Sequence, residues 1–297
     1  MKYVILGGAG HISNPLALQL LADGHQVTVI GRNAENLSTL VSKGVKAAIG
    51  SVNDKDFLVQ TFRGADAVYT MVPPTMEPED WKSYFAEVGS KYAAAIREAG
   101  VSNVVNLSSI GAHNRDGCGP VSGLFRVEEA LNSLEGVNIL HLRPSYFYYN
   151  FLSSIPMVKG MQIIGSNFGH ETFGLAISDT ADIAAEAARA LLDLDFKGHS
   201  HRYIYSDERT TAEIAAVIGD AIGNKNLPWI AFTDDQMLDG LLAAGLPREI
   251  ASNYTEMGAA IRSGKLQEDF KLNRPANAGK VKLEDFARQF KEAYEAL

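Results

Sequence analysis

The sequence predicts an α/β fold, in which a doubly wound parallel β-sheet is followed by a smaller, mostly helical C-terminal subdomain. Short apolar runs alternate with longer amphipathic stretches through the first half of the chain, a pattern typical of successive βαβ units. After Arg143-Pro144 the pattern shifts from strands to helices. We therefore expect residues 1–145 to form the core sheet, and residues 146–297 to complete that core and build the subdomain.

The expected elements follow this pattern along the chain. Strands are expected at 3–6, 26–30, 45–49, 67–72, 103–107 and 138–142. The helices between them are expected at 12–22, 34–43, 54–62, 81–98 and 124–133. The second part is expected to hold a loop at 165–174, a strand at 201–205, and helices at 180–194, 211–222, 234–244 and 248–263. Helical crossovers between such strands produce a doubly wound sheet.

Composition and charge restrict the classes of partner. The 297 residues are 46% hydrophobic and 21% charged, which is ordinary for a globular protein. A net charge of -8 argues against broad attraction to nucleic acid or to an anionic membrane. Cys118 is the single cysteine and cannot form an internal disulfide, so the cytoplasm is the expected compartment. We find no apolar run long enough to span a membrane and no metal-ligand spacing, and we expect neither a membrane segment nor a metal site.

A glycine-rich turn follows the first expected strand and opens the first expected helix. The segment is Gly7-Gly8-Ala9-Gly10-His11-Ile12-Ser13. Closely spaced glycines let the backbone turn sharply and approach a pyrophosphate, while the helix N-terminus offers unpaired N–H groups to the anion. The same pattern also occurs in turns that bind nothing. We interpret it as a Rossmann-type dinucleotide loop.

Arg32 indicates which dinucleotide is preferred. It follows the second expected strand and lies 22 positions beyond Gly10. In folds that prefer NAD, an acidic residue at about this distance accepts the ribose hydroxyls, whereas a guanidinium suits the 2′-phosphate of NADP. The alternative is a solvated surface charge. The sequence therefore predicts that NADP(H) is preferred over NAD(H).

Two further strand ends should border the cofactor, because ligands collect at the carboxyl ends of parallel strands. Ser51 follows the third strand and is expected near the adenine. Met71, Val72 and Pro73 follow the fourth strand and are expected beside the pyrophosphate and ribose. The alternative for both segments is ordinary turn chemistry.

Several segments together resemble the NmrA-like group of atypical short-chain dehydrogenases/reductases, which includes quinone-reductase-like enzymes and redox-sensing regulators. The likeness covers nearly the whole chain. It rests on the segments 4–12, 31–33, 104–112, 127–131, 142–147, 150–152 and 177–184.

This resemblance implies a role for individual residues. Gly7, Gly10, His11 and Ile12 would wrap the pyrophosphate, and Arg32 would meet the 2′-phosphate. Ser109 would lie near the nicotinamide ribose. The nicotinamide side would be lined by Pro144, Ser145, Tyr146 and Phe147.

The chain departs from the pattern of these relatives at three places. Ser13 replaces the third glycine of the loop, and Ser51 replaces an acidic residue that is common after the third strand. The Tyr-x-x-x-Lys pair of standard short-chain dehydrogenases, in which lysine lowers the pKa of a tyrosine acid/base, occurs nowhere in the sequence. Leu124 stands where relatives carry a lysine shortly before the helix of Val127. A tyrosine-lysine proton relay is therefore not expected.

Hydride transfer needs little beyond alignment of a nicotinamide with an acceptor, since the cofactor carries the difficult step. Ser109, His113 and Tyr148 are the candidate proton donors, although His113 also fits a surface loop. Tyr148 and Phe151 could stack on a flat acceptor, and Asn150 could bond a carbonyl. The alternatives are that the aromatic residues belong to the core and that Asn150 is a cap.

Three functions are compatible with these residues. We favour an NADPH-dependent reductase of a small conjugated carbonyl or quinone-like acceptor. The second is a non-enzymatic NADP(H)-binding redox sensor, with a regulatory protein partner, and a homodimer is compatible with either. The third, a nucleotide-sugar epimerase, relies on the missing tyrosine-lysine pair and is the least favoured.

Overall fold

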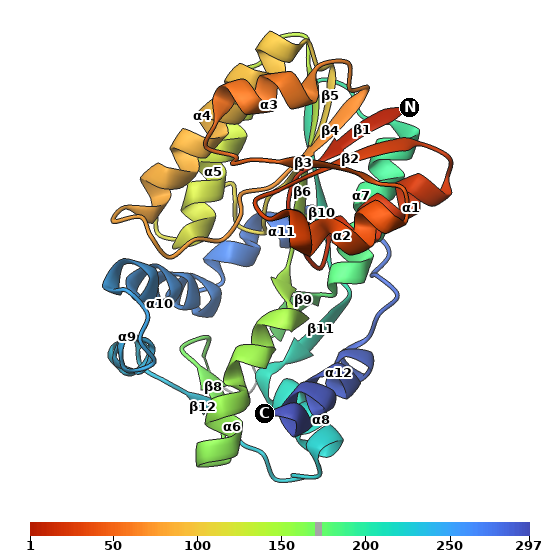
Figure 1. The fold of residues 1–297 in the computed structure, drawn as a ribbon. Coiled ribbons are helices and arrows are strands. Elements are labelled where there is room, and N and C mark those ends of the chain that lie inside the picture. Colours follow the sequence, from red (N-terminus) through yellow and green to blue (C-terminus); the bar gives the residue numbers. More distant parts are fainter. Residues whose placement is uncertain (170–173) are drawn as a thin grey trace.

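A seven-stranded parallel sheet forms the centre of the molecule (Figure 1). The computed structural model describes residues 1–169 and 174–297. The strand order is β10-β6-β5-β4-β1-β2-β3, so the chain reverses its direction of winding between β1 and β4. The strands are β1 (Lys2–Ile5), β2 (Gln26–Gly31), β3 (Lys46–Ile49), β4 (Ala67–Thr70), β5 (Asn103–Leu107), β6 (Asn138–Pro144) and β10 (His199–Ile204). The predicted doubly wound α/β fold is confirmed, and its seventh strand comes from the second part of the chain.

Helices cover both faces of the sheet (Figure 1). One face packs on Leu16 of α1 (Ser13–Ala22), Leu37 of α2 (Ala34–Ser42) and Ile183 of α7 (Thr180–Asp193). The opposite face is covered by α3 (Lys55–Phe62), α4 (Trp81–Ala99) and α5 (Pro120–Asn132). The central strand β4 is buried along its whole length, because it has a neighbour on each side and helices on both faces.

The start of α5 corrects the helix predicted at 124–133. The helix begins at Pro120, because proline suits the first helical position, where its missing N–H costs nothing. Gly123 lies inside this helix, where a Cβ would come within 2.8 Å of Phe85. A Cβ on Gly89 of α4 would likewise lie 2.9 Å from Val127 of α5. These two glycines let α4 and α5 approach closely, and Leu124 lies within α5 rather than ahead of it.

The second part of the chain builds a smaller body beside the carboxyl edge of the sheet (Figure 1). Strands β7, β9 and β11 form one small sheet, and β8 and β12 form another. These strands are β7 (Tyr146–Phe147), β8 (Ile164–Ser166), β9 (Gly174–Ser178), β11 (Asp207–Thr210) and β12 (Trp229–Ala231). The remaining helices are η1 (Tyr148–Ser154), α6 (Ile155–Met161), α8 (Thr211–Ile222), α9 (Asp234–Ala243), α10 (Arg248–Arg262), η2 (Lys265–Gln267), α11 (Glu268–Leu272) and α12 (Leu283–Ala296). Of the loop predicted at 165–174, residues 170–173 lie outside the described residues.

Asp182 in α7 ties the last segment of the chain to the body. Its carboxylate accepts hydrogen bonds from the Ser206 hydroxyl at 2.6 Å and from the backbone N–H groups of Lys280 at 2.9 Å and Val281 at 3.1 Å. These bonds position α12, which packs against α8 and η1. In the described parts of the chain, no helix is both long and apolar enough to cross a bilayer.

Candidate functional site

The glycine loop lies at the carboxyl edge of the sheet, directly after β1. Gly7 and Gly8 have φ values of +102° and +58°, which L side chains rarely adopt. A Cβ on Gly7 would lie 2.3 Å from the Ser13 hydroxyl. That hydroxyl is buried and donates to the Leu6 carbonyl at 2.7 Å. Ser13 therefore fits the third glycine position, because its side chain turns inward and leaves the outer surface of the loop open.

The start of α1 offers the Ser13 N–H to an anion, because the Asn14 N–H already donates to the Gly10 carbonyl at 2.9 Å and Pro15 has no N–H. Ile12 is the N-cap, no side chain makes a capping hydrogen bond, and the first turn contains no acidic residue. His11, one residue earlier, is exposed. An unpaired N–H group and the helix dipole together favour a negatively charged ligand at this end.

Arg32 stands at the end of β2, on the same edge of the sheet. It is exposed, and no carboxylate in the described residues forms an ion pair with it. The next residue, Asn33, caps α2 by accepting a hydrogen bond from the Glu35 N–H at 2.8 Å. The guanidinium is therefore a free cation beside a fixed helix start.

The segments that follow β3 and β4 make different contacts, and only the second is shown to touch the glycine loop. Ser51 accepts a hydrogen bond from the Asn53 N–H at 3.1 Å and so shapes its own turn. Met71 lies against the glycine loop, because its side chain would be 3.3 Å from a Cβ on Gly7. Its carbonyl accepts the Tyr92 hydroxyl at 2.7 Å. Val72 packs partly into the core under α4, and Pro73 is half-buried.

The ends of β5 and β6 are tied together. The Ile110 N–H donates to the Pro144 carbonyl at 2.8 Å, and the hydroxyl of half-buried Ser109 donates to the Ile110 carbonyl at 3.0 Å. Pro144 is buried. Ser145 is also buried, and its hydroxyl lies 2.6 Å from that of Ser178 in β9. Ser145 thus presents backbone rather than side chain to the edge of the sheet.

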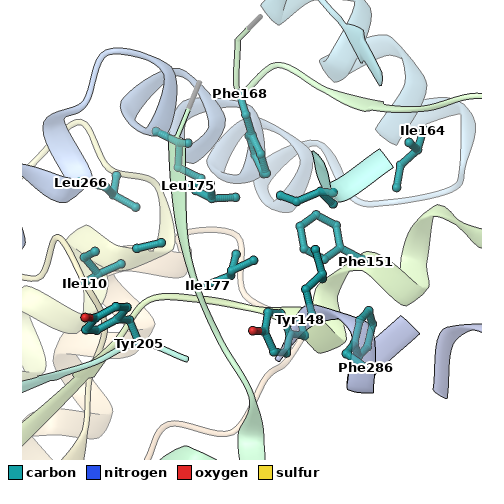
Figure 2. Packing of buried hydrophobic residues seen from close by; sticks show 14 of the residues in the cluster. Ile110, Tyr148, Phe151, Ile164, Phe168, Leu175, Ile177, Tyr205, Leu266 and Phe286 are labelled. Atoms are coloured by element: carbon teal, nitrogen blue, oxygen red, sulfur yellow. The ribbon is translucent and has the colours of Figure 1, made fainter. Parts of the chain in front are cut away.

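Aromatic residues follow β6 directly. The Tyr146 ring lies 5.4 Å from Phe151 and 5.1 Å from Phe168, and Figure 2 shows Phe151 and Phe168 in one cluster. Tyr146 and Phe147 are half-buried, whereas Phe151 is buried and Asn150 is exposed. Burial raises the pKa of Tyr146, so its phenol keeps its proton at neutral pH. Only part of the predicted aromatic lining is therefore open to a ligand.

Tyr148 does not fit its predicted role as a proton donor and substrate contact. Its side chain is 0% exposed and stacks on Phe286 with ring centroids 5.5 Å apart (Figure 2). The hydroxyl donates to the Val281 carbonyl at 3.3 Å. Burial also raises the pKa of this phenol. Tyr148 is a core residue that fastens η1 to α12.

His113 lies beside a buried cluster of charged residues rather than against the glycine loop. The Asn114 amide donates to its Nε2 at 3.0 Å, so Nδ1 carries the proton, and that atom is buried without a partner in the described residues. Burial lowers the pKa of His113, while Asp269 and Arg143 act on it electrostatically. The neutral ring thus offers one N–H donor.

Arg143 and Glu128 are the centre of that cluster. Two guanidinium nitrogens of Arg143 donate to the carboxylate of Glu128, at 2.6 and 3.0 Å, and a third donates to the Tyr203 hydroxyl at 3.2 Å. Tyr203 in turn donates to Asp269 of α11. Burial alone would raise the pKa of Glu128, but the bonds from Arg143 outweigh it and hold the pKa below its usual value. The cluster fastens α5, β6, β10 and α11 together.

A second buried row of polar side chains crosses the sheet from β4 to α5. Thr70 donates to Asn106 at 2.9 Å, the Asn106 amide donates to Nδ1 of His141 at 3.1 Å, and Nε2 of His141 donates to Asn132 at 2.9 Å. A second proton on His141 would face the amide N–H of Asn106. Burial accordingly lowers the pKa of His141 to about 4.

This row predicts a loss of stability in mild acid. Unfolded His141 takes up a proton near pH 6.5, whereas the folded protein resists it until about pH 4, so stability falls as the pH drops between these values. At pH 5 the loss from this residue is about 2 kcal/mol. Urea unfolding at pH 7 and pH 5 measures it, and His141→Gln should flatten the pH dependence by that amount. An unchanged pH dependence in the variant would contradict the assignment.

Tyr149 was not among the predicted site residues. Its ring lies 4.2 Å from that of His11 in the glycine loop, although its neighbour Tyr148 is in the core. No signal in the aromatic run 146–149 distinguishes the residue that reaches the loop from those that do not. This contact joins the glycine loop to the segment after β6 at the carboxyl edge of the sheet.

Most of the chain matches a known protein family. Residues 2–286 match the model described as the NmrA-like family. A (4-alkanoyl-5-oxo-2,5-dihydrofuran-3-yl)methyl phosphate reductase from Streptomyces griseus is 27% identical over 220 residues, which cover 74% of this chain and 73% of the relative. Agroclavine dehydrogenase from Claviceps fusiformis is 23% identical over 280 residues, covering 89% and 88%.

Solved structures of low sequence identity share the fold. An NADPH-dependent quinone oxidoreductase from Escherichia coli, in complex with NADPH, superposes with a TM-score of 0.82 at 19% identity and covers 97% of this chain and 99% of its own. A triphenylmethane reductase from Citrobacter sp., in complex with NADP(H), gives a TM-score of 0.80 at 18% identity and covers 98% and 100%. These likenesses confirm the Rossmann-type architecture. Together with the family match across residues 2–286, they establish that the chain belongs to the NmrA-like family.

Proposed function

We propose that the chain is an NADP(H)-dependent oxidoreductase that reduces a small conjugated carbonyl or quinone-like acceptor. The observation that carries this proposal is the shape of the Gly7 loop. A Cβ on Gly7 would fill the turn, and the turn leads into a helix whose first N–H groups have no side-chain cap. These residues fit a dinucleotide pyrophosphate. The reductases among the relatives support the same reaction class.

Each group at this edge would do a separate part of the work. The loop and the start of α1 would hold the pyrophosphate, with Met71 packed behind Gly7. Arg32 would bind the 2′-phosphate. Ser109 and the backbone of Pro144 and Ser145 would flank the nicotinamide, which when bound supplies the hydride. The exposed Asn150 amide and the half-buried face of Tyr146 would contact the acceptor.

The identity of the proton donor restricts which acceptors can be reduced. Tyr148 is buried, and we take Ser109, which follows β5 at the carboxyl edge of the sheet, as the donor. A serine hydroxyl is a weak acid. A conjugated acceptor suits this site, because the anion formed after hydride addition is delocalised and can take its proton from Ser109 or water.

The test is oxidation of NADPH by a panel of quinones and α,β-unsaturated carbonyl compounds, followed by absorbance. We expect at least one acceptor to raise oxidation well above the protein-free rate, and Ser109→Ala to lower kcat more than it changes NADPH affinity. Tight NADPH binding without turnover on any acceptor would contradict the enzyme and favour a redox sensor. In that case NADPH and NADP⁺ should differ in their effect on the protein's conformation or on a partner's binding.

A further inference from the structure

A ring contact joins the glycine loop to the segment that follows β6. His11 and Tyr149 have ring centroids 4.2 Å apart, with planes inclined at 41°. Both residues are exposed, Tyr149 by 45%, which is unusual for an aromatic side chain. Two solvent-facing rings from distant parts of the sequence thus meet at the mouth of the proposed dinucleotide site.

The backbone that carries Tyr149 is firmly fixed. Tyr148 on one side is stacked on Phe286 and bonded to the Val281 carbonyl. Phe151 on the other side is buried, and its carbonyl accepts the Ser154 hydroxyl at 2.6 Å. Two anchored aromatic residues, Tyr148 and Phe151, therefore hold the backbone at Tyr149. Because this backbone is already ordered, the Tyr149 ring loses little conformational entropy when it contacts His11.

The backbone that carries His11 is equally defined. The Gly10 N–H donates to the Gly7 carbonyl at 3.1 Å, and the Asn14 N–H donates to the Gly10 carbonyl at 2.9 Å. His11 stands directly before the uncapped first turn of α1. A ring packed on His11 therefore lies beside the start of α1, where the pyrophosphate would bind.

We propose that Tyr149 is a positioning residue for the dinucleotide, whose ring holds the His11 side chain beside the bound pyrophosphate. This inference rests on the proposed function. In this proposal Tyr149 acts through His11 and takes no part in hydride transfer. Its effect is to slow release of the cofactor, because the His11–Tyr149 contact must break before the His11 side chain can move away from the pyrophosphate.

Stopped-flow fluorescence of bound NADPH, displaced by excess NADP⁺, measures the release rate. An aromatic pair of this kind corresponds to a change of about 2- to 12-fold. We expect Tyr149→Ala and His11→Ala each to speed release by a factor in this range. The double variant should be no faster than the faster single variant, because both substitutions break the same contact. Tyr149→Phe keeps the ring and should release NADPH at nearly the wild-type rate.

The chain provides a matched control at the opposite edge of the sheet. His25 also contacts a tyrosine ring, that of Tyr3, at 5.3 Å. His25→Ala should leave the release rate unchanged. The inference would be overturned if the wild-type protein binds NADPH but Tyr149→Ala releases it at the wild-type rate. Additive effects of Tyr149→Ala and His11→Ala on the release rate would overturn it too. Failure of the wild-type protein to bind NADPH would instead overturn the proposed function, and this inference with it.

Discussion

Replacing Arg143 with methionine is expected to lower the free energy of unfolding by about 3–5 kcal/mol. The substitution leaves the Glu128 carboxylate, whose side chain is 6% exposed, without the two hydrogen bonds from the guanidinium. Tyr203 loses a donor at the same time. Most of this loss arises because the Glu128 charge stays buried without a partner. The intact Arg143–Glu128 pair itself stabilises the fold little, since its attraction roughly balances the free energy of removing both charges from water. Urea denaturation at pH 7 measures the change.

Arg189 is the matched control for Arg143. It lies on the surface of α7, 43% exposed, with carboxylates of Glu186 at 2.9 Å and Asp193 at 3.2 Å. Arg189→Met should cost no more than about 1 kcal/mol, because solvent screens these pairs. Adding Glu128→Leu to Arg143→Met removes the orphaned charge and should recover part of the loss. Equal costs for Arg143→Met and Arg189→Met would show that burial of the pair is energetically unimportant.

The central sheet could be predicted because its strands carry a strong local signal. Residues 103–107 were predicted as a strand and form β5 with the same bounds, and the strand predicted at 201–205 forms β10 at 199–204, at one edge of the sheet. Continuous apolar runs bounded by glycine or polar residues produce this signal in parallel sheets. The helix α12 was missed although Leu283, Phe286, Ala287 and Phe290 show the spacing of a buried helix face.

The candidate site was harder to predict where two adjacent residues of the same type differ in burial. Tyr148 and Tyr149 are both tyrosines after the same strand, yet one is in the core and the other contacts the glycine loop. The difference depends on Val281 and Phe286, which the chain brings to η1 from its far end. Contacts of this range leave no local pattern. The glycine loop, by contrast, is built from adjacent residues, so its turn and its position before α1 could be predicted.

Arg32 is expected to be the main source of discrimination between NADPH and NADH. Charge-assisted hydrogen bonds to a phosphate contribute about 1.5–3 kcal/mol, which corresponds to roughly 10- to 150-fold in affinity. The guanidinium has no carboxylate partner in the described residues, so it need not break an ion pair before it binds a phosphate. Arg32→Ala should therefore weaken NADPH binding by a factor in this range, and the exposed position of Arg32 favours the lower end.

Only the 2′-phosphate distinguishes the two cofactors, so NADH affinity should stay within about twofold in Arg32→Ala, and the loss for NADPH should shrink as salt is raised. Fluorescence titrations with both cofactors at two salt concentrations measure these changes. Arg63 is the control, because it is exposed at the opposite edge of the sheet, among residues such as Lys2 and Lys46. Arg63→Ala removes one positive charge, as Arg32→Ala does, but should leave both affinities unchanged. Equal losses for NADPH and NADH in Arg32→Ala would mean that the guanidinium contacts a part common to both dinucleotides, and the preference for NADP(H) would then need another source.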